Sequence, residues 1–260
     1  MKQVFLGAFV LALFSCNNTD TKKTETTAVS NSDLVQQNLK GKVQELDELN
    51  INMDSTGKAK ADSTTNVSVF DEKGYQTKYW TKDSSGKTVS EQTLSRNPDG
   101  TFAEVVYMKN GKQVSKLTTE VKDGKYIGGK NYDSTGKQDS YYSDLKTNDY
   151  GIVYAGKQHF MNDKIKSTFD MKYDGPNFIG GTATDSTGKT SYTGTVKLDD
   201  KGNAIEEKTT TLEKDSTKTE VVTYKYDATD DKGNWTQRTT YNDKGKATKM
   251  VKRTITYFKD

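Results

Sequence analysis

Short stretches of alternating apolar and polar residues follow one another from Lys42 to the end of the chain. The alternation is clearest over residues 75–82, 102–108, 235–241 and 251–257. A period of two is typical of β-strands, and it places Trp235 and Tyr241 on one face and Arg238 on the other. Neither face of these stretches is purely apolar. The pattern therefore predicts a sheet that is wetted on both sides and stabilised by cross-strand pairs.

Glycine-containing turns separate the predicted strands. The sequence Asp-Ser-Thr/Ser-Gly-Lys occurs at residues 54–58, 83–87, 133–137 and 185–189. Together with degenerate copies, these sites lie roughly 24 to 30 residues apart, which indicates an internal repeat. Asp at the first turn position accepts main-chain hydrogen bonds and Gly supplies a positive φ, so each site predicts a tight turn. A second set of turns lies about midway between them, and in an up-and-down meander the two sets occupy opposite ends of the sheet.

The turns predict about sixteen strands of roughly 8 to 10 residues. The expected fold is all-β: a long antiparallel meander in a twisted single-layer or partly curled sheet, after a short N-terminal helix. Only 31% of residues are hydrophobic and the mean hydropathy is −0.92, which argues against the alternative of a two-layered sandwich. A capping-box pattern at residues 30–33 predicts the helix, within residues 33–41, and residues 42–260 form the repeat sheet domain.

The N-terminal residues are typical of an exported lipoprotein. Lys2 and an apolar run predict a signal peptide over residues 1–15, too short to span a bilayer. The run ends in Leu-Phe-Ser-Cys, which resembles the bacterial lipobox and implies lipidation of Cys16, the only cysteine of the chain. A chance cysteine after an ordinary signal peptide is the alternative. Residues 16–32 are Thr-, Asn- and Ser-rich and predict a flexible tether.

Charge and residue inventory restrict the chemistry. A net charge of +3 without long basic runs does not favour nucleic-acid binding. With a single histidine, His159, and a lipidated cysteine, no His/Cys metal cluster can form, and no cofactor is expected. Residues 227–233 resemble a calcium loop, but Arg238 stands where an EF-hand has Glu. Paired carboxylates for glycan hydrolysis are possible, yet no pair stands out.

Exposed aromatic side chains are the best candidates for ligand contact, because planar rings can stack on sugars, peptides or other apolar surfaces. The alternative is that they stack on one another across strands and replace a core. The candidate residues are Tyr79, Trp80, Tyr141, Tyr142, Trp235 and Tyr241.

Several turns carry an aromatic or Leu residue, then Asp or Asn, and Gly three positions later. These are found at residues 70–75, 132–137, 198–203 and 241–246. They resemble YD repeats of the Rhs type, and together with the lipobox the chain resembles YD-repeat-like lipoproteins of the Bacteroidota. It lacks the toxin tail of Rhs proteins and is too short to enclose a cargo.

These observations predict a non-catalytic lipoprotein, anchored in the outer membrane through Cys16, whose sheet presents an extended binding or scaffolding surface. A glycan or an envelope protein is the expected partner, and the face of the membrane is left open. An envelope hydrolase with an Asp/Glu pair and a toxin-immunity lipoprotein are the alternatives. Sixteen strands also suit an outer-membrane barrel, but the strands lack a continuous apolar outward face.

Overall fold

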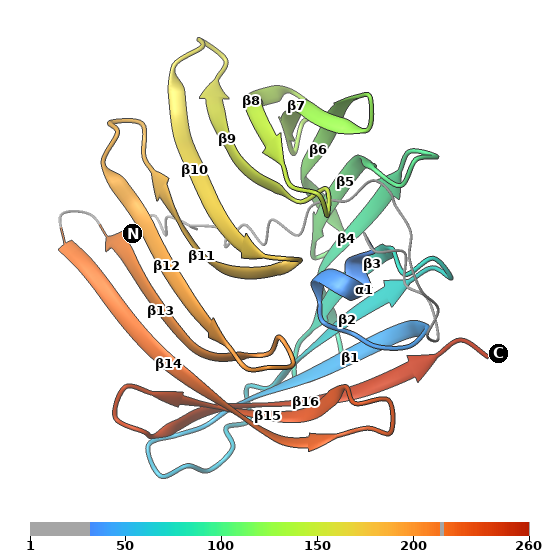
Figure 1. Ribbon diagram of the computed structural model, residues 1–260, viewed down its shortest axis with the longest axis vertical. Helices are drawn as coiled ribbons and strands as arrows, with labels where there is room; N and C mark the ends of the chain where they lie inside the picture. Colours follow the sequence, from blue (N-terminus) through green and yellow to red (C-terminus); the bar gives the residue numbers. More distant parts are fainter. Residues whose placement is uncertain (1–31, 214–215, 260) are drawn as a thin grey trace.

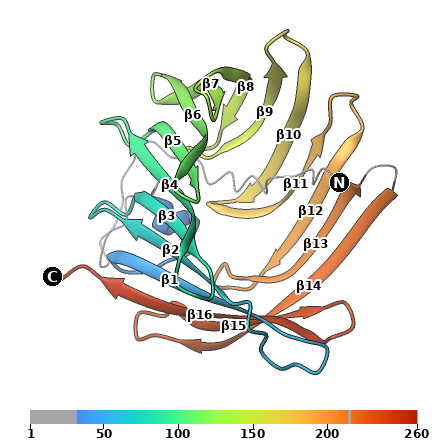
Figure 2. The same ribbon diagram turned by 180° about the vertical axis from the view of Figure 1, so that it is seen from behind.

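The computed structural model describes residues 32–213 and 216–259, which form one short helix and sixteen strands. The helix α1 is Asp33–Gln36. The strands are β1 Val43–Asn52, β2 Thr64–Phe70, β3 Gln76–Lys82, β4 Thr88–Arg96, β5 Phe102–Lys109, β6 Lys112–Lys122, β7 Lys125–Asp133, β8 Gln138–Thr147, β9 Val153–Phe160, β10 Ile165–Asp174, β11 Asn177–Thr184, β12 Thr190–Leu198, β13 Ala204–Glu213, β14 Ser216–Thr229, β15 Trp235–Asn242 and β16 Ala247–Tyr257. Consecutive strands pair antiparallel, and β1 pairs with β16, so the sheet closes into a barrel (Figures 1 and 2).

The closure corrects the prediction of an open sheet. The all-β class and the sixteen strands agree with the sequence analysis, but the twisted single-layer sheet is wrong, and so is the idea that both faces are wetted. Pairing of β1 with β16 from Leu46 to Asn52 satisfies the hydrogen-bonding groups that two free edges would expose. Low apolar content does not oppose this closure, because a barrel encloses only one face of each strand.

Successive turns alternate between the two ends of the barrel, as predicted, because every consecutive strand pair is antiparallel. We call the end with the Asp-Ser-Thr/Ser-Gly-Lys turns the repeat end. In the first of these turns, Asp54 Oδ1 accepts hydrogen bonds from the amides of Thr56 and Lys58, at 2.7 and 3.0 Å. Gly57 has a φ of +81°, as a turn of this kind requires.

Residues 32–42, which we call the plug, cross the opposite end of the barrel and define the plug end. On one side, the Leu34 amide donates to the Gly74 carbonyl in the β2–β3 turn. On the other, Asn38 donates to the Lys201 carbonyl at 2.9 Å. Lys40 exchanges hydrogen bonds with the side chain of Asn234, at 2.7 and 2.9 Å. The plug therefore ties hairpins from opposite halves of the sheet.

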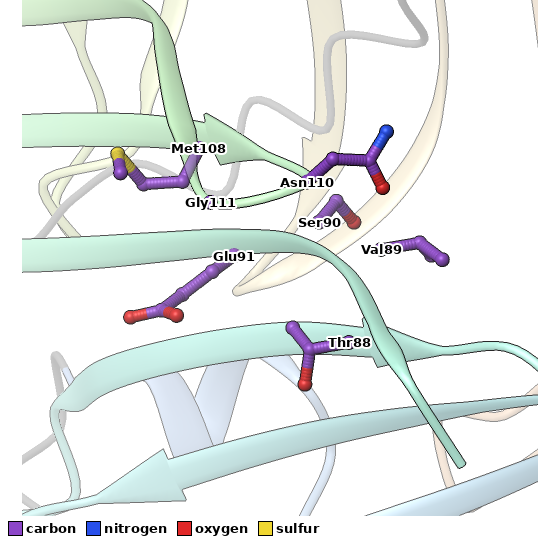
Figure 3. A pocket seen from close by; sticks show the side chains of 7 residues that line it. All are labelled: Thr88, Val89, Ser90, Glu91, Met108, Asn110 and Gly111. Atoms are coloured by element: carbon purple, nitrogen blue, oxygen red, sulfur yellow. The ribbon is translucent and has the colours of Figure 1, made fainter.

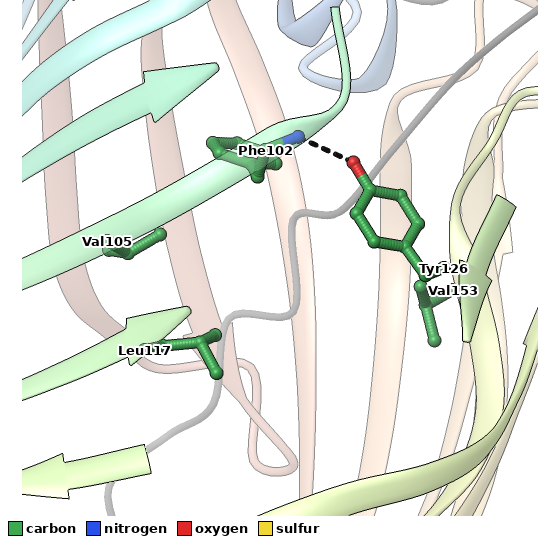
Figure 4. Packing of buried hydrophobic residues seen from close by; sticks show 5 residues of the cluster. All are labelled: Phe102, Val105, Leu117, Tyr126 and Val153. Atoms are coloured by element: carbon green, nitrogen blue, oxygen red, sulfur yellow. Dashed lines mark hydrogen bonds between the residues drawn. The ribbon is translucent and has the colours of Figure 1, made fainter. Parts of the chain in front are cut away.

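The inner face of the barrel is identified by its contacts with the plug, since paired residues of neighbouring strands point to the same side. Leu46 and Phe70 pack in one buried cluster with Leu34 and Leu39 of the plug, and α1 lies within the ring of strands (Figures 1 and 2). A second inner cluster contains Phe102, Val105, Leu117, Tyr126 and Val153 (Figure 4).

The outer face is polar. Charged side chains on it form ion pairs between neighbouring strands or within one strand. These pairs are Lys116–Glu104, Lys130–Glu120, Lys157–Asp144, Lys197–Glu206 and Lys225–Asp227. The outer face therefore carries paired charges, whereas the two apolar clusters lie inside.

Burial of the inner face decreases from the plug end to the repeat end. Near the plug, Val43, Phe70 and Phe102 have at most 2% of their surface exposed. Several residues that face inward by register are exposed at the repeat end. They are Lys109, Phe160, Lys218 and Glu220. The described residues thus form a cup, which the plug closes at one end and whose inner face is exposed to solvent at the other.

Closure predicts that β1 and β16 can be crosslinked. Leu49 and Lys252 lie opposite one another on the outer face. With Cys16 replaced by Ser, we expect the pair L49C and K252C to react completely with a short bifunctional maleimide, as measured by mass spectrometry. The matched control is L49C with T223C, because β14 is separated from β1 by two strands. Equal yields from both pairs would contradict a closed barrel.

Candidate functional site

The three arginines of the chain, Arg96, Arg238 and Arg253, stand against 36 lysines (39 − 3). All three lie inside the barrel and against aromatic rings. Arg is suited to buried positions because its planar guanidinium stacks on rings and is weakly hydrated. Arg96 belongs to the plug contacts, whereas the other two lie together on β15 and β16.

A β-bulge positions the indole of this site. Thr229 of β14 lies opposite Trp235, and Ala228 lies opposite Gln237, so Thr236 is an extra residue on β15. A bulge turns the side chain beyond it to the other face. Trp235 therefore points inward with Arg238, which corrects the strict alternation that placed them on opposite faces.

Arg253 lies deep in this site. Its Nε donates to Glu48 Oε1 at 3.0 Å across the β1–β16 pairing, and its guanidinium lies 3.4 Å from the centre of a Trp235 ring. Its side chain is 9% exposed. Glu48 accepts from Nε of the Arg253 guanidinium. The Nη1 atom of the same guanidinium is buried without a hydrogen-bond partner within the described part of the chain.

Arg238 lies between two aromatic rings. Its guanidinium carbon is 4.6 Å from the Tyr224 ring and 4.9 Å from Trp235. Its Nε is likewise buried and has no hydrogen-bond acceptor among the described residues. The Tyr224 hydroxyl donates to Glu207 Oε2 at 2.8 Å. We call Glu48, Glu207, Arg238, Lys249 and Arg253, with Tyr224 and Trp235, the arginine cluster.

The pKa shifts in the arginine cluster follow from burial and a surplus of positive charge. Burial lowers the pKa of Lys249, and the positive charge of Arg238 lowers it further. Burial also lowers the pKa of Arg253, although the carboxylate of Glu48 opposes this change. The pKa of Tyr224 is raised by burial and then by the negative charge of Glu207, so its hydroxyl stays protonated as a donor.

The aromatic residues predicted for ligand contact do not form one surface. Tyr79 and Tyr142 point inward, where burial raises the pKa of both hydroxyls, that of Tyr142 to about 12. Their sequence neighbours Trp80 and Tyr141 point outward, since successive residues of a strand face opposite sides.

Of the remaining candidates, Tyr241 lies opposite Thr223 on the outer face. Trp235 alone belongs to the arginine cluster. Cys16, the predicted lipidation site, lies outside the described residues.

His159 lies on the outer face and contacts a serine. Ser143 Oγ is 2.8 Å from His159 Nε2, and the imidazole stacks on Tyr141 with ring centres 4.7 Å apart. A nucleophile–base pair is usually oriented by a third group, often a carboxylate. Here Nδ1 faces the main-chain oxygen of Asp163 at 3.2 Å, while the Asp163 carboxylate accepts from Tyr141. These contacts connect the β8 and β9 side chains to the β9–β10 turn and stabilise it.

A hollow of about 220 Å³ lies at the β4–β5 hairpin (Figure 3). It is open to solvent, and Glu91 is the ionisable residue of its lining. No group of three or more potential metal ligands occurs within residues 32–213 and 216–259. In the same ranges, no helix combines the length and apolarity that crossing a bilayer requires.

The aspartates of the four repeat turns have lowered pKa values. In each, the largest cause is a hydrogen bond from a Ser or Thr hydroxyl two residues on, such as Thr56 to Asp54 at 2.8 Å. The other three are Asp83, Asp133 and Asp185. A carboxylate whose folded pKa lies below its unfolded value stabilises the fold above the unfolded pKa, and this contribution is lost as pH falls through the folded pKa.

We therefore expect the thermal midpoint to fall as pH is lowered from about 5 to about 2, through the ordinary Asp pKa of about 3.9. Circular dichroism melts at each pH measure this. The variant with all four aspartates changed to Asn keeps an acceptor oxygen but cannot titrate, so its curve is expected to be shallower. An unchanged slope would show that other carboxylates govern the acid transition.

Comparison with known proteins identifies the fold but no family. No family model and no curated protein matches the sequence. A porin-like protein from Bacteroides uniformis has a similar structure, with a TM-score of 0.55 and 14% identity over 82% of this chain and 96% of that chain. A chain of the TcdB2-TccC3-Cdc42 complex matches with a TM-score of 0.31 and 16% identity, over 74% of this chain and 10% of that one. The likeness to the porin-like protein supports the barrel fold.

Sequence reasoning missed the arginine cluster. Arg253 and Glu48 are 205 positions apart and meet through the β1–β16 closure that the open sheet excluded. The available signal was the scarcity of Arg in a Lys-rich chain, because sequences that use Lys on the surface place Arg where stacking and burial favour it.

Proposed function

We propose that this chain is a non-catalytic, lipid-anchored envelope protein whose barrel stands in water and binds a small ligand on its inner face. The carrying observation is the graded inner face: apolar and closed at the plug end, polar and exposed at the repeat end. The binding surface is thus the interior of a cup and not the extended sheet that the sequence predicts.

The outer face argues for a barrel outside the bilayer. Transmembrane barrels present an apolar band to lipid and a polar interior, and a charge facing lipid at mid-depth is strongly unfavourable. Here interstrand ion pairs such as Lys116–Glu104 and Lys197–Glu206 lie on the outer face, and apolar clusters lie inside. The likeness to the porin-like protein therefore supports the barrel architecture only. The lipid on Cys16, and not the barrel, attaches the chain to the membrane.

A thiol-labelling experiment tests the cup. In the purified full chain with Cys16 replaced by Ser, T81C faces inward and half-buried toward the repeat end, whereas V105C lies in the buried cluster near the plug. We expect a small maleimide to modify T81C in the folded protein and to modify V105C only after unfolding. Equal protection of both would mean that the interior is closed, which would overturn the proposed binding role.

The anchor is tested in cells that carry Cys16 or C16S. We expect the natural chain in the membrane fraction and the C16S chain in the soluble fraction. Finding both chains in the membrane fraction after a carbonate wash would instead favour a barrel inserted in lipid.

The hydrolase alternative can be addressed in the same interior. Glu48 and Glu207 both face inward, but each is engaged, by Arg253 and Tyr224 respectively. Turnover of a glycan that E48Q and E207Q each abolish would replace the binding proposal with an enzymatic one.

A further inference from the structure

Positive charge exceeds negative charge in the arginine cluster, on the inner face of the neighbouring strands β13, β14, β15, β16 and β1. The inward-facing cations of the arginine cluster are Arg238, Lys249 and Arg253, and its carboxylates are Glu48 and Glu207. Lys218 and Glu220, nearer the repeat end, pair with one another and add no net charge. Three cations against two carboxylates leave a surplus of one positive charge. One further anionic group would neutralise the cluster.

The guanidinium groups also have unused hydrogen-bond donors. Arg253 is more than nine-tenths buried, and its Nη1 has no partner among the described residues. The Nε atom of Arg238 is also buried without a partner among the described residues, and both guanidinium groups lie against Trp235. A buried charged donor without an acceptor is costly, so the arrangement is incomplete as it stands.

Lys249 lies on the side of the arginine cluster that faces the repeat end. Strand β16 runs from Ala247 at that end to Tyr257 beside the plug, and Lys249, half-buried, lies nearer the repeat end than Arg253. A ligand that enters the cup therefore meets the Lys249 ammonium before it reaches the guanidinium groups.

We infer that the arginine cluster binds the carboxylate group of a small ligand, through the free donors of Arg238 and Arg253. The inference rests on the proposed function and specifies the chemistry of its ligand. A guanidinium edge matches a carboxylate, and one negative charge balances the cluster. A phosphate, with a charge of about −1.5 to −2, would bring surplus negative charge beside Glu48 and Glu207.

Trp235 provides a reporter at the site. The chain has two Trp residues, and Trp80 lies on the outer face, so W80F leaves Trp235 as the sole indole. The full chain carrying W80F is titrated with acetate, with inorganic phosphate and with chloride at constant ionic strength, and Trp235 fluorescence is followed. We expect a saturable change with acetate and a much weaker one with phosphate or chloride.

Four variants in the W80F chain separate binding from structure. R238Q is expected to weaken acetate binding about tenfold or more, because it removes a charge-assisted donor. R238K, which keeps the charge and loses the planar donors, provides a second measurement if R238Q does not fold. E48Q is expected to strengthen binding, because it removes the carboxylate that competes for Arg253. K225Q, on the outer face of β14, is the matched control and is expected to leave binding unchanged.

The outcomes separate the two proposals. Acetate binding that follows the expected order supports the carboxylate site. No response to acetate, a preference for phosphate, or an equal loss of binding in K225Q overturns it. If T81C is reactive while Trp235 does not respond, the cup stands and the carboxylate site falls. If T81C is also protected, the proposed function falls as well.

Discussion

Replacing Phe102 with Ala is expected to lower the free energy of unfolding by about 3–5 kcal/mol. Phe102 is 1% exposed and belongs to the second inner cluster (Figure 4). The Arg96 guanidinium lies 3.6 Å from the centre of its ring. Truncation loses the transfer free energy of the ring and leaves a cavity that the rigid strands cannot fill. Urea titration of the purified chain, followed by circular dichroism, measures the change.

Phe160→Ala is the matched control, since the same atoms are removed from a ring that is 40% exposed at the repeat end. Its expected cost is below about 1 kcal/mol. Similar losses for both variants would mean that the inner cluster is not packed as described.

Replacing Asp33 with Ala is expected to cost about 3–5 kcal/mol, because it leaves a buried cation without its partner. The Asp33 carboxylate accepts from Arg96 Nη2 at 2.5 Å and from the Gln76 amide at 2.5 Å. The two side chains are 4% and 11% exposed. Burial raises the pKa of Asp33, and the positive charge of Arg96 opposes that rise. The same urea titration applies.

Two controls identify the cause. Glu120→Ala breaks an ion pair of similar chemistry on the outer face, with side chains 44% and 46% exposed, and is expected to cost less than about 1 kcal/mol. Combining Asp33→Leu with Arg96→Met replaces the buried pair with apolar side chains and is expected to recover most of the lost stability. If the double variant is as unstable as Asp33→Ala alone, the ion pair is not the origin of the loss.

The local structure could be predicted from the sequence because it is encoded in short segments. The Asp-Ser-Thr-Gly-Lys turns have the hydrogen bonds that their residues favour, and the strands between them number sixteen as expected. Each turn depends on about five consecutive residues, so one sequence suffices to identify it.

The closure could not be predicted in that way. It depends on pairing between strands at opposite ends of the chain, and a low apolar content argues against a two-layered sandwich without arguing against a barrel. The interior instead uses amphipathic side chains, such as Tyr126, whose hydroxyl accepts from the Phe102 amide at 2.7 Å, and Tyr226, which donates to the Ala204 carbonyl. A count of hydrophobic residues underestimates such a core, because much of the buried area belongs to Tyr and Arg stems.

The candidate site was missed for a related reason. Fourteen of the sixteen strand pairings contain a register shift, so strict alternation fails near the turns. The bulge at Thr236 turns the Trp235 side chain to the inner face, where it contacts Arg253. The sequence identified Trp235 as a candidate, but its partners come from the closure.

The β1–β16 pairing also sets an order of assembly. Fifteen pairings join consecutive strands and can form as local hairpins, whereas Val43 meets Tyr257 across 214 positions (257 − 43). Contacts so distant in sequence carry the largest loop-closure entropy and form slowly. The plug bond from Lys40 to Asn234 spans 194 positions and depends on the same late strands. A chain that emerges from its N-terminus therefore exists first as an open sheet with two free edges, and the final strand converts this aggregation-prone intermediate into the closed barrel.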